Sequence, residues 1–327
     1  MQFKMNLVCR TLMAMASVAA AVGFAATAQA QAYPVKPPEL TVMFPAGSSA
    51  DVVARLLAEG ISRNLGQPVT VMNRPGAGGA IAYKFAQAQK PDGYSMIFYS
   101  NSISTLHYSG MLPFDQKAFE PVARVTVELP VIAVKSDAPW NNLSDLMAYA
   151  KKNPAALRVG NSGLGSHTHI TGEAFFGEQA AAVTHVAFGS GQVITSLLGG
   201  HIEAVVQLPG ALSAHVRSGM LKVLGTLGTV REPAFPNVPT AIEQGLPFQA
   251  ELWRGIAVPK GTPRPVIARL EEAVRTAVNS TEFKAQGEKL GFLPAFQPPA
   301  EFARTVDAEH LALSKLMDKA GLKKNQP

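Results

Sequence analysis

The sequence has 327 residues, of which 47% are hydrophobic and 16% are charged, and its formal net charge is +6. The basic residues are scattered and form neither a stripe nor a cluster with aromatic residues, so the composition does not favour nucleic-acid binding. The length allows one large domain or two ordinary domains with sizeable cores. After residue 30 no apolar run is long enough to span a membrane, and we expect that part of the chain to be soluble.

The first 30 residues carry the features of a cleaved signal peptide. Lys4 and Arg10 precede or flank an uncharged run rich in Ala, Met and Val at residues 11–27, and Ala28 and Ala30 supply a small-residue cleavage site. Cleavage would remove Cys9, the single cysteine, and would leave 27 basic against 23 acidic residues, a net charge of +4. An uncleaved membrane anchor is the alternative. We expect an exported protein that its core stabilises without disulfides.

Residues 39–99 alternate between strand-like and helix-like patterns. Apolar runs predict strands at residues 40–44, 69–72 and 94–99, and helical spacing of apolar residues predicts helices at 52–65 and 80–89. This order is typical of a parallel sheet with right-handed crossovers. The loops after the first two strands would then lie at the carboxyl ends of those strands, where open α/β sheets bind ligands.

The loop at residues 44–51 is a candidate ligand contact. Gly47 allows the backbone to turn close to a ligand, and Ser48 with Asp51 three residues later forms a capping-box pattern. Unpaired backbone N–H groups and a partial positive charge at a helix N-terminus can hold an anion without Arg or Lys. We therefore hypothesise that this loop holds a carboxylate. The alternative is that Ser48 and Asp51 only cap the helix.

A second α/β series starts at residue 131. We predict its strands at residues 131–134, 157–159, 183–188, 202–208 and 221–227, and its helices at 143–150, after Ser166, and at 193–198. A Pro-rich irregular segment follows at 231–239, and residues 251–258 are strand-like. Two amphipathic helices are predicted in the last seventy residues, at 265–279 and 301–322.

Several runs of this sequence are typical of one family. The segments FPAGSSADVV, NRPGAGG, PDGY, GNSGLGSHTHITGEAF and WRGIAVPKGTP occur in this order after residue 30, and NRPGAGG followed by PDGY is the most specific pair. In these runs the chain resembles the periplasmic substrate-binding receptors of tripartite tricarboxylate transporters, the Bug family. The resemblance implies an α/β, two-lobed type II periplasmic binding protein fold, a Venus flytrap with a ligand cleft between the lobes.

The resemblance also implies lobe boundaries. Residues 31–130 and 254–327 would form the first lobe, which clasps a carboxylate, and residues 131–253 would form the second lobe, which sets specificity. We expect the chain to cross between lobes near residues 128–131 and 252–256, and we assign the last two helices to the first lobe.

The function that follows from the resemblance is solute capture. A periplasmic receptor would take a small carboxylate-containing molecule into the cleft and deliver it to separate membrane transporter subunits, without covalent chemistry. We expect a monomer that is not an enzyme and that uses no cofactor, no metal and no nucleic acid. An alternative role for the same fold is to present the ligand to a periplasmic sensor domain.

By position, the resemblance assigns the ligand site to loops of both lobes. In the first lobe, backbone N–H groups and hydroxyls would clasp one carboxylate, and an aromatic ring would pack on the apolar part of the ligand. The first-lobe residues are Phe44, Ala46, Gly47, Ser48, Ser49, Asp51, Gly76, Ala77, Gly78 and Gly79. The second lobe would contribute Ser162, Ser166, His167, Thr168, Ser190 and Gln207.

The chain departs from the usual family pattern at a few positions, and these affect the expected ligand more than the expected fold. Ser48 replaces a glycine, Ala50 a threonine, Met72 a glutamate, and Gln207 an Asp, Thr or Asn. A neutral amide would therefore face the ligand from the second lobe. Arg74 could meet an anion, but a structural bridge to carbonyls or acids is the favoured interpretation.

Two other classes of function are alternatives. An exported α/β hydrolase would need a nucleophile elbow, but residues 160–164 do not match G-x-S-x-G. A metal site would draw on His167 and His169, with His185 and His201, but no paired zinc spacing is present in the sequence.

Overall fold

The computed structural model describes residues 33–188, 192–319 and 321–324. The predicted signal peptide, residues 1–30, lies outside the described residues. The chain divides into two units, with the boundary after Val35, and both β-sheets belong to the second unit, Lys36–Pro327. Within the described residues, no helix combines the length and the apolar character needed to cross a membrane.

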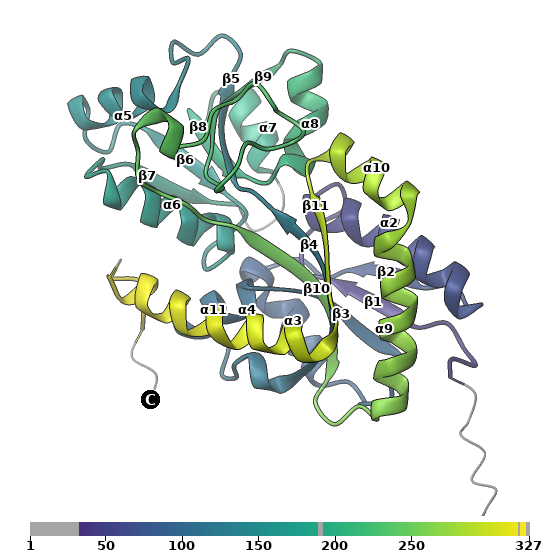
Figure 1. The fold of residues 1–327 in the computed structure, drawn as a ribbon. Helices are drawn as coiled ribbons and strands as arrows, with labels where there is room; N and C mark the ends of the chain where they lie inside the picture. The colour runs from purple at the N-terminus through teal and green to yellow at the C-terminus, as the bar shows by residue number, and fades with distance from the viewer. Residues whose placement is uncertain (1–32, 189–191, 320, 325–327) are drawn as a thin grey trace, which may run out of the picture. The chain divides into compact units, whose positions relative to one another are not determined.

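The first sheet has six strands in the order β11-β4-β10-β3-β1-β2. They are β1 (Glu39–Val42), β2 (Thr70–Asn73), β3 (Ser95–Ser100), β4 (Phe119–Glu128), β10 (Leu252–Pro259) and β11 (Leu293–Gln297). β1 pairs in parallel with β2 and β3, as predicted, whereas β10 runs antiparallel to β3 and β4. The chain therefore returns to the first sheet late in the sequence (Figure 1).

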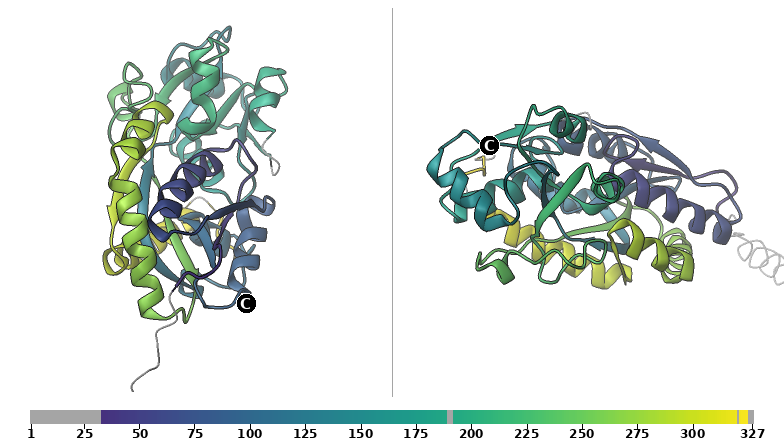
Figure 2. Two further views of the ribbon diagram at one scale, coloured as in Figure 1. Left: turned by 90° about the vertical axis from the view of Figure 1, so that its right-hand side faces the viewer. Right: turned by 90° about the horizontal axis from the view of Figure 1, so that it is seen from above.

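The helices around this sheet come from both ends of the second unit. They are α2 (Ser49–Leu65), α3 (Ala80–Gln87), α4 (Ser102–Tyr108), α9 (Arg264–Asn279), α10 (Thr281–Leu290) and α11 (Pro299–Lys319), with the short 3-10 helices η1 (Ala77–Gly79) and η2 (Gln116–Ala118). Figure 2 shows α2 beside α9, and the two helices are in contact. Helix α11, yellow in Figure 1, contacts strand β4 and helix α4, and it also contacts α6 (His167–Glu178).

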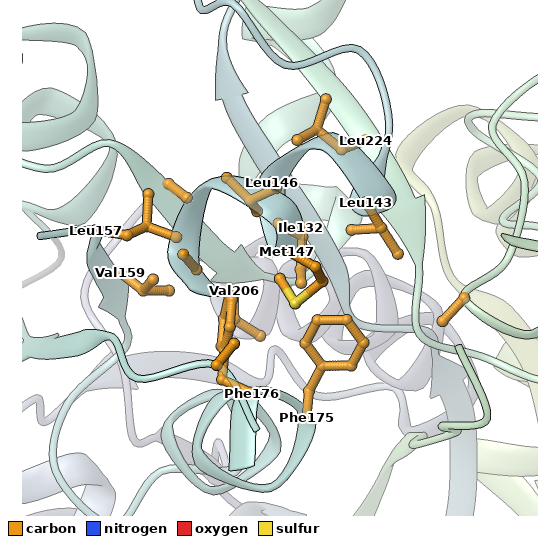
Figure 3. Close-up of a cluster of buried hydrophobic side chains, with 14 of the residues drawn as sticks. Ile132, Leu143, Leu146, Met147, Leu157, Val159, Phe175, Phe176, Val206 and Leu224 are labelled. Atoms are coloured by element: carbon orange, nitrogen blue, oxygen red, sulfur yellow. The ribbon is translucent and has the colours of Figure 1, made fainter. Parts of the chain in front are cut away.

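The second sheet has five strands in the order β7-β6-β8-β5-β9. They are β5 (Val131–Lys135), β6 (Arg158–Asn161), β7 (Thr184–Ala187), β8 (Ala204–Gln207) and β9 (Leu221–Thr226); the helices are α5 (Leu143–Lys152), α6 (His167–Glu178), α7 (Val193–Leu198), α8 (Pro209–Arg217) and η3 (Ile242–Gln244). Figure 3 shows the core in which Leu146 of α5 and Phe175 of α6 meet Ile132 and Val206 of the sheet. Each such buried side chain contributes about 1.5–3 kcal/mol to folding.

Local sequence explains where α2 begins and ends. The hydroxyl of Ser48, the N-cap, accepts a hydrogen bond from the backbone N–H of Asp51 at 3.3 Å. The Asp51 carboxylate accepts from the backbone N–H of Gly47 at 3.0 Å instead of from that of Ser48, so only half of the predicted capping box forms. The helix ends at Gly66, which adopts the left-handed conformation with φ 69°.

Two connections link the sheets. Leu129 and Pro130 join β4 to β5, in agreement with the predicted crossing at residues 128–131. The return connection comes before Leu252, because Leu252 and Trp253 already pair with β4. The predicted crossing at residues 252–256 therefore lies within β10. An apolar run indicates a strand, but it does not show at which residue the chain passes from one sheet to the other. The lobe boundaries themselves stay a prediction.

Apart from the short 3-10 helices, five elements were not predicted from the sequence: α4, β4, α8, α10 and β11. Every residue of α4 except His107 is buried, so no polar face reveals its period. Helix α10 buries only Phe283 and Gly287, too few apolar positions to show helical spacing. β11 contains Pro294 and lies at the sheet edge, where proline is tolerated.

Candidate ligand-binding site

A cavity of about 240 Å³ is lined by residues from both sheets and their connections. Sites for drug-sized ligands occupy roughly 300–1,000 Å³, so this cavity suits a smaller molecule. Most of the lining follows the carboxyl ends of β1, β3, β6, β7 and β8: Phe44, Pro45, Ala46, Gly47, Ser48, Ser49, Ala50, Ser102, Ser162, Ser166, His167, Thr168, Phe188 and Leu208. The remaining lining residues are Val193, Ile194, Thr195, Gln207, Ala211, His215, Leu252 and Arg254.

The N-terminus of α2 forms one wall of the cavity. Ser48 and Ser49 line this wall, and the backbone N–H groups of Ser49 and Ala50 make no hydrogen bond to another described residue. Free N–H groups are expected in the first turn of a helix. Together with the partial positive charge of the helix end, they make this wall attractive to an anion.

Asp51 does not line the cavity, but it holds the loop that forms this wall. Its Oδ1 accepts a hydrogen bond from Asn73 Nδ2 at 2.9 Å and pairs with Arg55 at 2.9 Å, while its Oδ2 accepts from the Gly47 N–H. Burial raises the pKa of Asp51, but the hydrogen bonds from Arg55, Gly47 and Asn73 outweigh burial and leave the pKa below its usual value. Both oxygens are therefore engaged in holding the loop.

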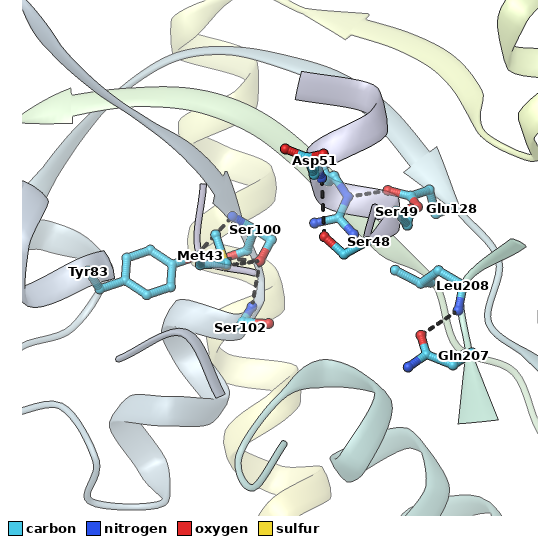
Figure 4. Close-up of polar contacts among 11 residues, drawn as sticks. Met43, Ser48, Ser49, Asp51, Tyr83, Ser100, Ser102, Glu128, Gln207 and Leu208 are labelled. Atoms are coloured by element: carbon cyan, nitrogen blue, oxygen red, sulfur yellow. Dashed lines mark hydrogen bonds and ion pairs between the residues drawn. The ribbon is translucent and has the colours of Figure 1, made fainter. Parts of the chain in front are cut away.

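A buried ion pair lies beside the same wall. Arg254 on β10 donates from Nε to Oε1 of Glu128 at the end of β4, and Ser49 Oγ donates to Oε2 of the same carboxylate. The side chains of Arg254 and Glu128 are 1% and 0% exposed. Figure 4 shows Ser48 and Ser49 close to Glu128 at the start of α2. Because an unpaired buried charge is strongly destabilising, this network holds each of its members in place.

The N-terminus of α6 lines the cavity from the second sheet. The hydroxyl of Ser166 caps this helix, and His167 and Thr168 of the first turn line the cavity. His167 is 4% exposed, and its Nδ1 lies 3.3 Å from Thr171 Oγ1. Burial, and secondly the positive charge of Arg254, lowers the pKa of His167 to about 4. The imidazole is therefore neutral at pH 7 and acts only as a hydrogen-bonding group.

Gln207 and Ser162 supply a neutral polar surface on the same side. Gln207 Nε2 donates to Ser162 Oγ at 2.8 Å, and its Oε1 accepts from the backbone N–H of Leu208 at 3.2 Å. Figure 4 shows Gln207 and Leu208 at the end of β8. The amide is thus held in one orientation by its own sheet.

The structure brings most of the residues predicted from the sequence to this one cavity. Those that line it are Phe44, Ala46, Gly47, Ser48, Ser49, Ser162, Ser166, His167, Thr168 and Gln207. Ser190 lies outside the described residues. Asp51, Gly76, Ala77, Gly78 and Gly79 do not line the cavity.

The 76–79 loop instead contacts the loop that precedes α6. A Cβ at Gly78, where φ is +65°, would lie 2.3 Å from the carbonyl oxygen of Leu164. Thr105 Oγ1 donates to the Gly165 carbonyl at 2.6 Å in the same region. Arg74, at the start of this loop, pairs with Glu39 at 2.9 Å and lies over the ring of Phe85, which is a structural arrangement.

Four polar lining residues were not predicted: Thr195, and the three residues Ser102, His215 and Arg254, which share one feature. Each of the three has a buried side-chain atom with no hydrogen-bond partner among the described residues, namely Ser102 Oγ, His215 Nδ1 and Arg254 Nη1. Arg254 carries a sequence signal, because it interrupts an otherwise uncharged strand and buried arginines need partners. Ser102 and His215 carry no comparable signal.

Two of the four histidines considered for a metal site share a carboxylate partner. In the described part of the chain, no group of three or more His, Cys, Asp or Glu side chains is placed to hold a metal ion. His169 and His185 share Glu173, whose two oxygens lie 3.4 Å and 3.6 Å from their Nε2 atoms.

A family model and several curated relatives match this chain. The model described as "Tripartite tricarboxylate transporter family receptor" matches residues 53–322. The UPF0065 protein in the gbd 5' region of Cupriavidus necator is 32% identical over 317 residues, which cover 95% of this chain and 96% of that protein. Protein BugT of Bordetella pertussis is 34% identical over 278 residues, which cover 82% of this chain and 85% of BugT.

Similar folds are found in solved structures that contain carboxylates. The R. palustris protein Rpa4515 with adipate has a TM-score of 0.85 and 26% identity, and the match covers 88% of this chain and 98% of that one. MatC from Rhodopseudomonas palustris with bound malate has a TM-score of 0.81 and 27% identity, and the match covers 87% of this chain and 99% of that one.

Proposed function

Because this chain belongs to the tripartite tricarboxylate transporter receptor family, we propose that it captures a small carboxylate in the cavity between its two sheets. It is a solute-binding receptor and not an enzyme. Two similar solved proteins contain adipate and malate, both dicarboxylates. They support a ligand of the same chemical class for this chain.

The observation that carries this proposal is the convergence of two helix N-termini on one cavity. Helix α2 has 17 residues and α6 has 12, and the first turns of both line the cavity from different sheets. The N-terminus of each helix favours negative charge through free N–H groups and the helix dipole. A carboxylate thus finds donors on both sides of the cavity.

The apolar part of the lining limits the rest of the ligand. Phe44, Phe188, Val193, Ile194, Leu208 and Leu252 surround the polar groups. An apolar body, either a short aliphatic chain or an aromatic ring, fits such a surface because it leaves no polar atom unpaired.

The binding cycle we propose uses two lobes, residues 31–130 with 254–327 and residues 131–253. The first lobe takes up the carboxylate from the periplasm, and the second lobe closes over it. Ligand binding stabilises the closed form, which separate membrane transporter subunits then recognise. In this scheme the receptor is a monomer, exported with a signal peptide at residues 1–30.

A thermal-shift screen of the ligand-stripped protein against small carboxylates and their primary amides tests this function. An acid present at 100 times its dissociation constant adds about 2.7 kcal/mol of apparent stability. We expect at least one acid to raise the melting temperature while its amide does not. Absence of any shift across mono-, di- and tricarboxylates would contradict the proposed function.

A further inference from the structure

Arg254 differs from the other residues that line the cavity in its positive charge. It is the only Lys or Arg among the described residues that line the cavity, and it is 1% exposed. Its Nε donates to Glu128, but its Nη1 is buried and makes no hydrogen bond to another described residue. A buried guanidinium N–H without an acceptor is costly, so this donor is suited to an acceptor that arrives with the ligand.

Ser102 supplies a second donor from the first residue of α4, just after the neighbouring strand. In the first sheet Arg254 of β10 lies opposite Ser100 of β3, and Ser102 follows two residues after the end of β3. The Oγ of Ser102 is fully buried, lines the same cavity and has no partner among the described residues. Two unmet donors thus come from β10 and from the start of α4, which follows the adjacent strand β3.

We propose, building on the function proposed above, that Arg254 is the specificity-determining residue of this site and binds a ligand carboxylate through Nη1, with Ser102 donating a second hydrogen bond. Glu128 and Ser49 are positioning residues. Their contacts fix the guanidinium so that its remaining N–H groups are available to the ligand.

The chemistry of this arrangement selects for charge. A guanidinium has five N–H donors and no acceptor, so it satisfies a carboxylate and leaves the NH₂ group of an amide without a partner. Hydrogen bonds between two charged groups are roughly twice as strong as neutral ones. Arg254 therefore gives this receptor a preference for an acid over its amide that backbone donors alone would not provide.

The test must remove the charge of Arg254 without leaving another charge buried. Arg254→Gln alone leaves Glu128 without its partner, which destabilises the fold. The double variant R254Q/E128Q removes both charges. The matched control is R158Q/E203Q, which removes an Arg–Glu pair that does not line the cavity.

Calorimetric titration measures the affinity of each variant for the best acid from the thermal-shift screen and for the amide of that acid. We expect R254Q/E128Q to lose roughly 10- to 100-fold in affinity for the acid, while its affinity for the amide changes by less than about threefold. The control should keep the wild-type ratio of acid to amide affinity. Ser102→Ala should lower acid affinity by a smaller factor, roughly two- to tenfold.

Two outcomes would overturn this assignment alone. One is an undiminished affinity of R254Q/E128Q for the acid, and the other is an equal loss for both compounds, which leaves the acid-to-amide ratio unchanged and indicates general damage to the site. If the wild type itself binds no acid, the proposed function fails, and the role of Arg254 fails with it.

Discussion

At the scale of single residues, the buried carboxyl group of Glu232 is only partly compensated by hydrogen bonds. Its Oε1 accepts a hydrogen bond from the backbone N–H of Ala234 at 3.2 Å, whereas its Oε2 has no partner among the described residues. Glu232 is 0% exposed, and burial, with a smaller contribution from the charge of Glu128, raises its pKa to about 7.

We predict that Glu232 makes the fold less stable as the pH rises. The folded-state pKa of about 7 lies above the ordinary value of 4.5, so the stabilisation by the protonated form is complete below pH 4.5 and is lost as the pH rises through 7. Glu232→Gln removes the charge and keeps the acceptor for Ala234. Relative to the wild type, the variant should gain up to about 3 kcal/mol in the free energy of unfolding between pH 4.5 and pH 8.

Urea unfolding of both proteins at intervals across that pH range measures the difference directly. His167, whose pKa is lowered, contributes a pH dependence of the opposite sign below pH 6.5, but it is present in both proteins and cancels from the comparison. A difference that stays constant with pH would show that Glu232 does not titrate in this range.

At the scale of elements, the features that could be predicted from the sequence are those that short-range patterns determine. The strands and helices of residues 39–99, the cap at Ser48 and the loops at the carboxyl ends of β1 and β6 all follow from short-range spacing and turn residues. The antiparallel return of β10 and the burial of Arg254 depend on contacts between distant segments, which no local pattern contains. The close approach of Gly78 to the Leu164 carbonyl likewise joins distant segments, and the contact of the 76–79 loop with ligand stays a prediction.

Two helix caps provide a matched pair of variants. Ser48 caps α2 at the cavity, and Ser280 caps α10 by accepting from the Phe283 N–H at 3.1 Å, outside the cavity lining. Replacing either serine by alanine should cost about 1 kcal/mol of stability. Only Ser48→Ala should also weaken acid binding, by roughly three- to tenfold. Chemical denaturation and calorimetry give the two quantities, and equal affinities for the two variants would speak against a role of the α2 N-terminus.

Gly78 tests the contact between the two loops. Gly78→Val places a side chain against the Leu164 carbonyl, whereas Gly219→Val introduces a similar strain at φ +74° with no heavy atom within 4 Å of the Cβ. We expect Gly78→Val to weaken acid binding and to leave a larger radius of gyration with acid present, because the loops can no longer approach. Identical affinities and scattering profiles for the two variants would contradict this.

At the scale of the whole second unit, the cavity lies between two sheets that two connections join, and α11 contacts helices beside both sheets. This architecture could be predicted mainly because the sequence resembles a family. A signature such as NRPGAGG is more specific than the pattern of strands and helices. The size of the cavity and the unpaired donors of Ser102 and Arg254 become visible only in the folded chain.

The most direct test of the account is to fill the cavity. Ala211 of α8 lines it, and Ala214, three residues later on the same helix, is exposed and does not. Calorimetry with the best acid should show binding of one molecule per chain to the wild type and to Ala214→Trp, and no detectable binding to a folded Ala211→Trp, because the indole occupies the ligand space. Undiminished binding by Ala211→Trp would place the carboxylate elsewhere and contradict the central claim.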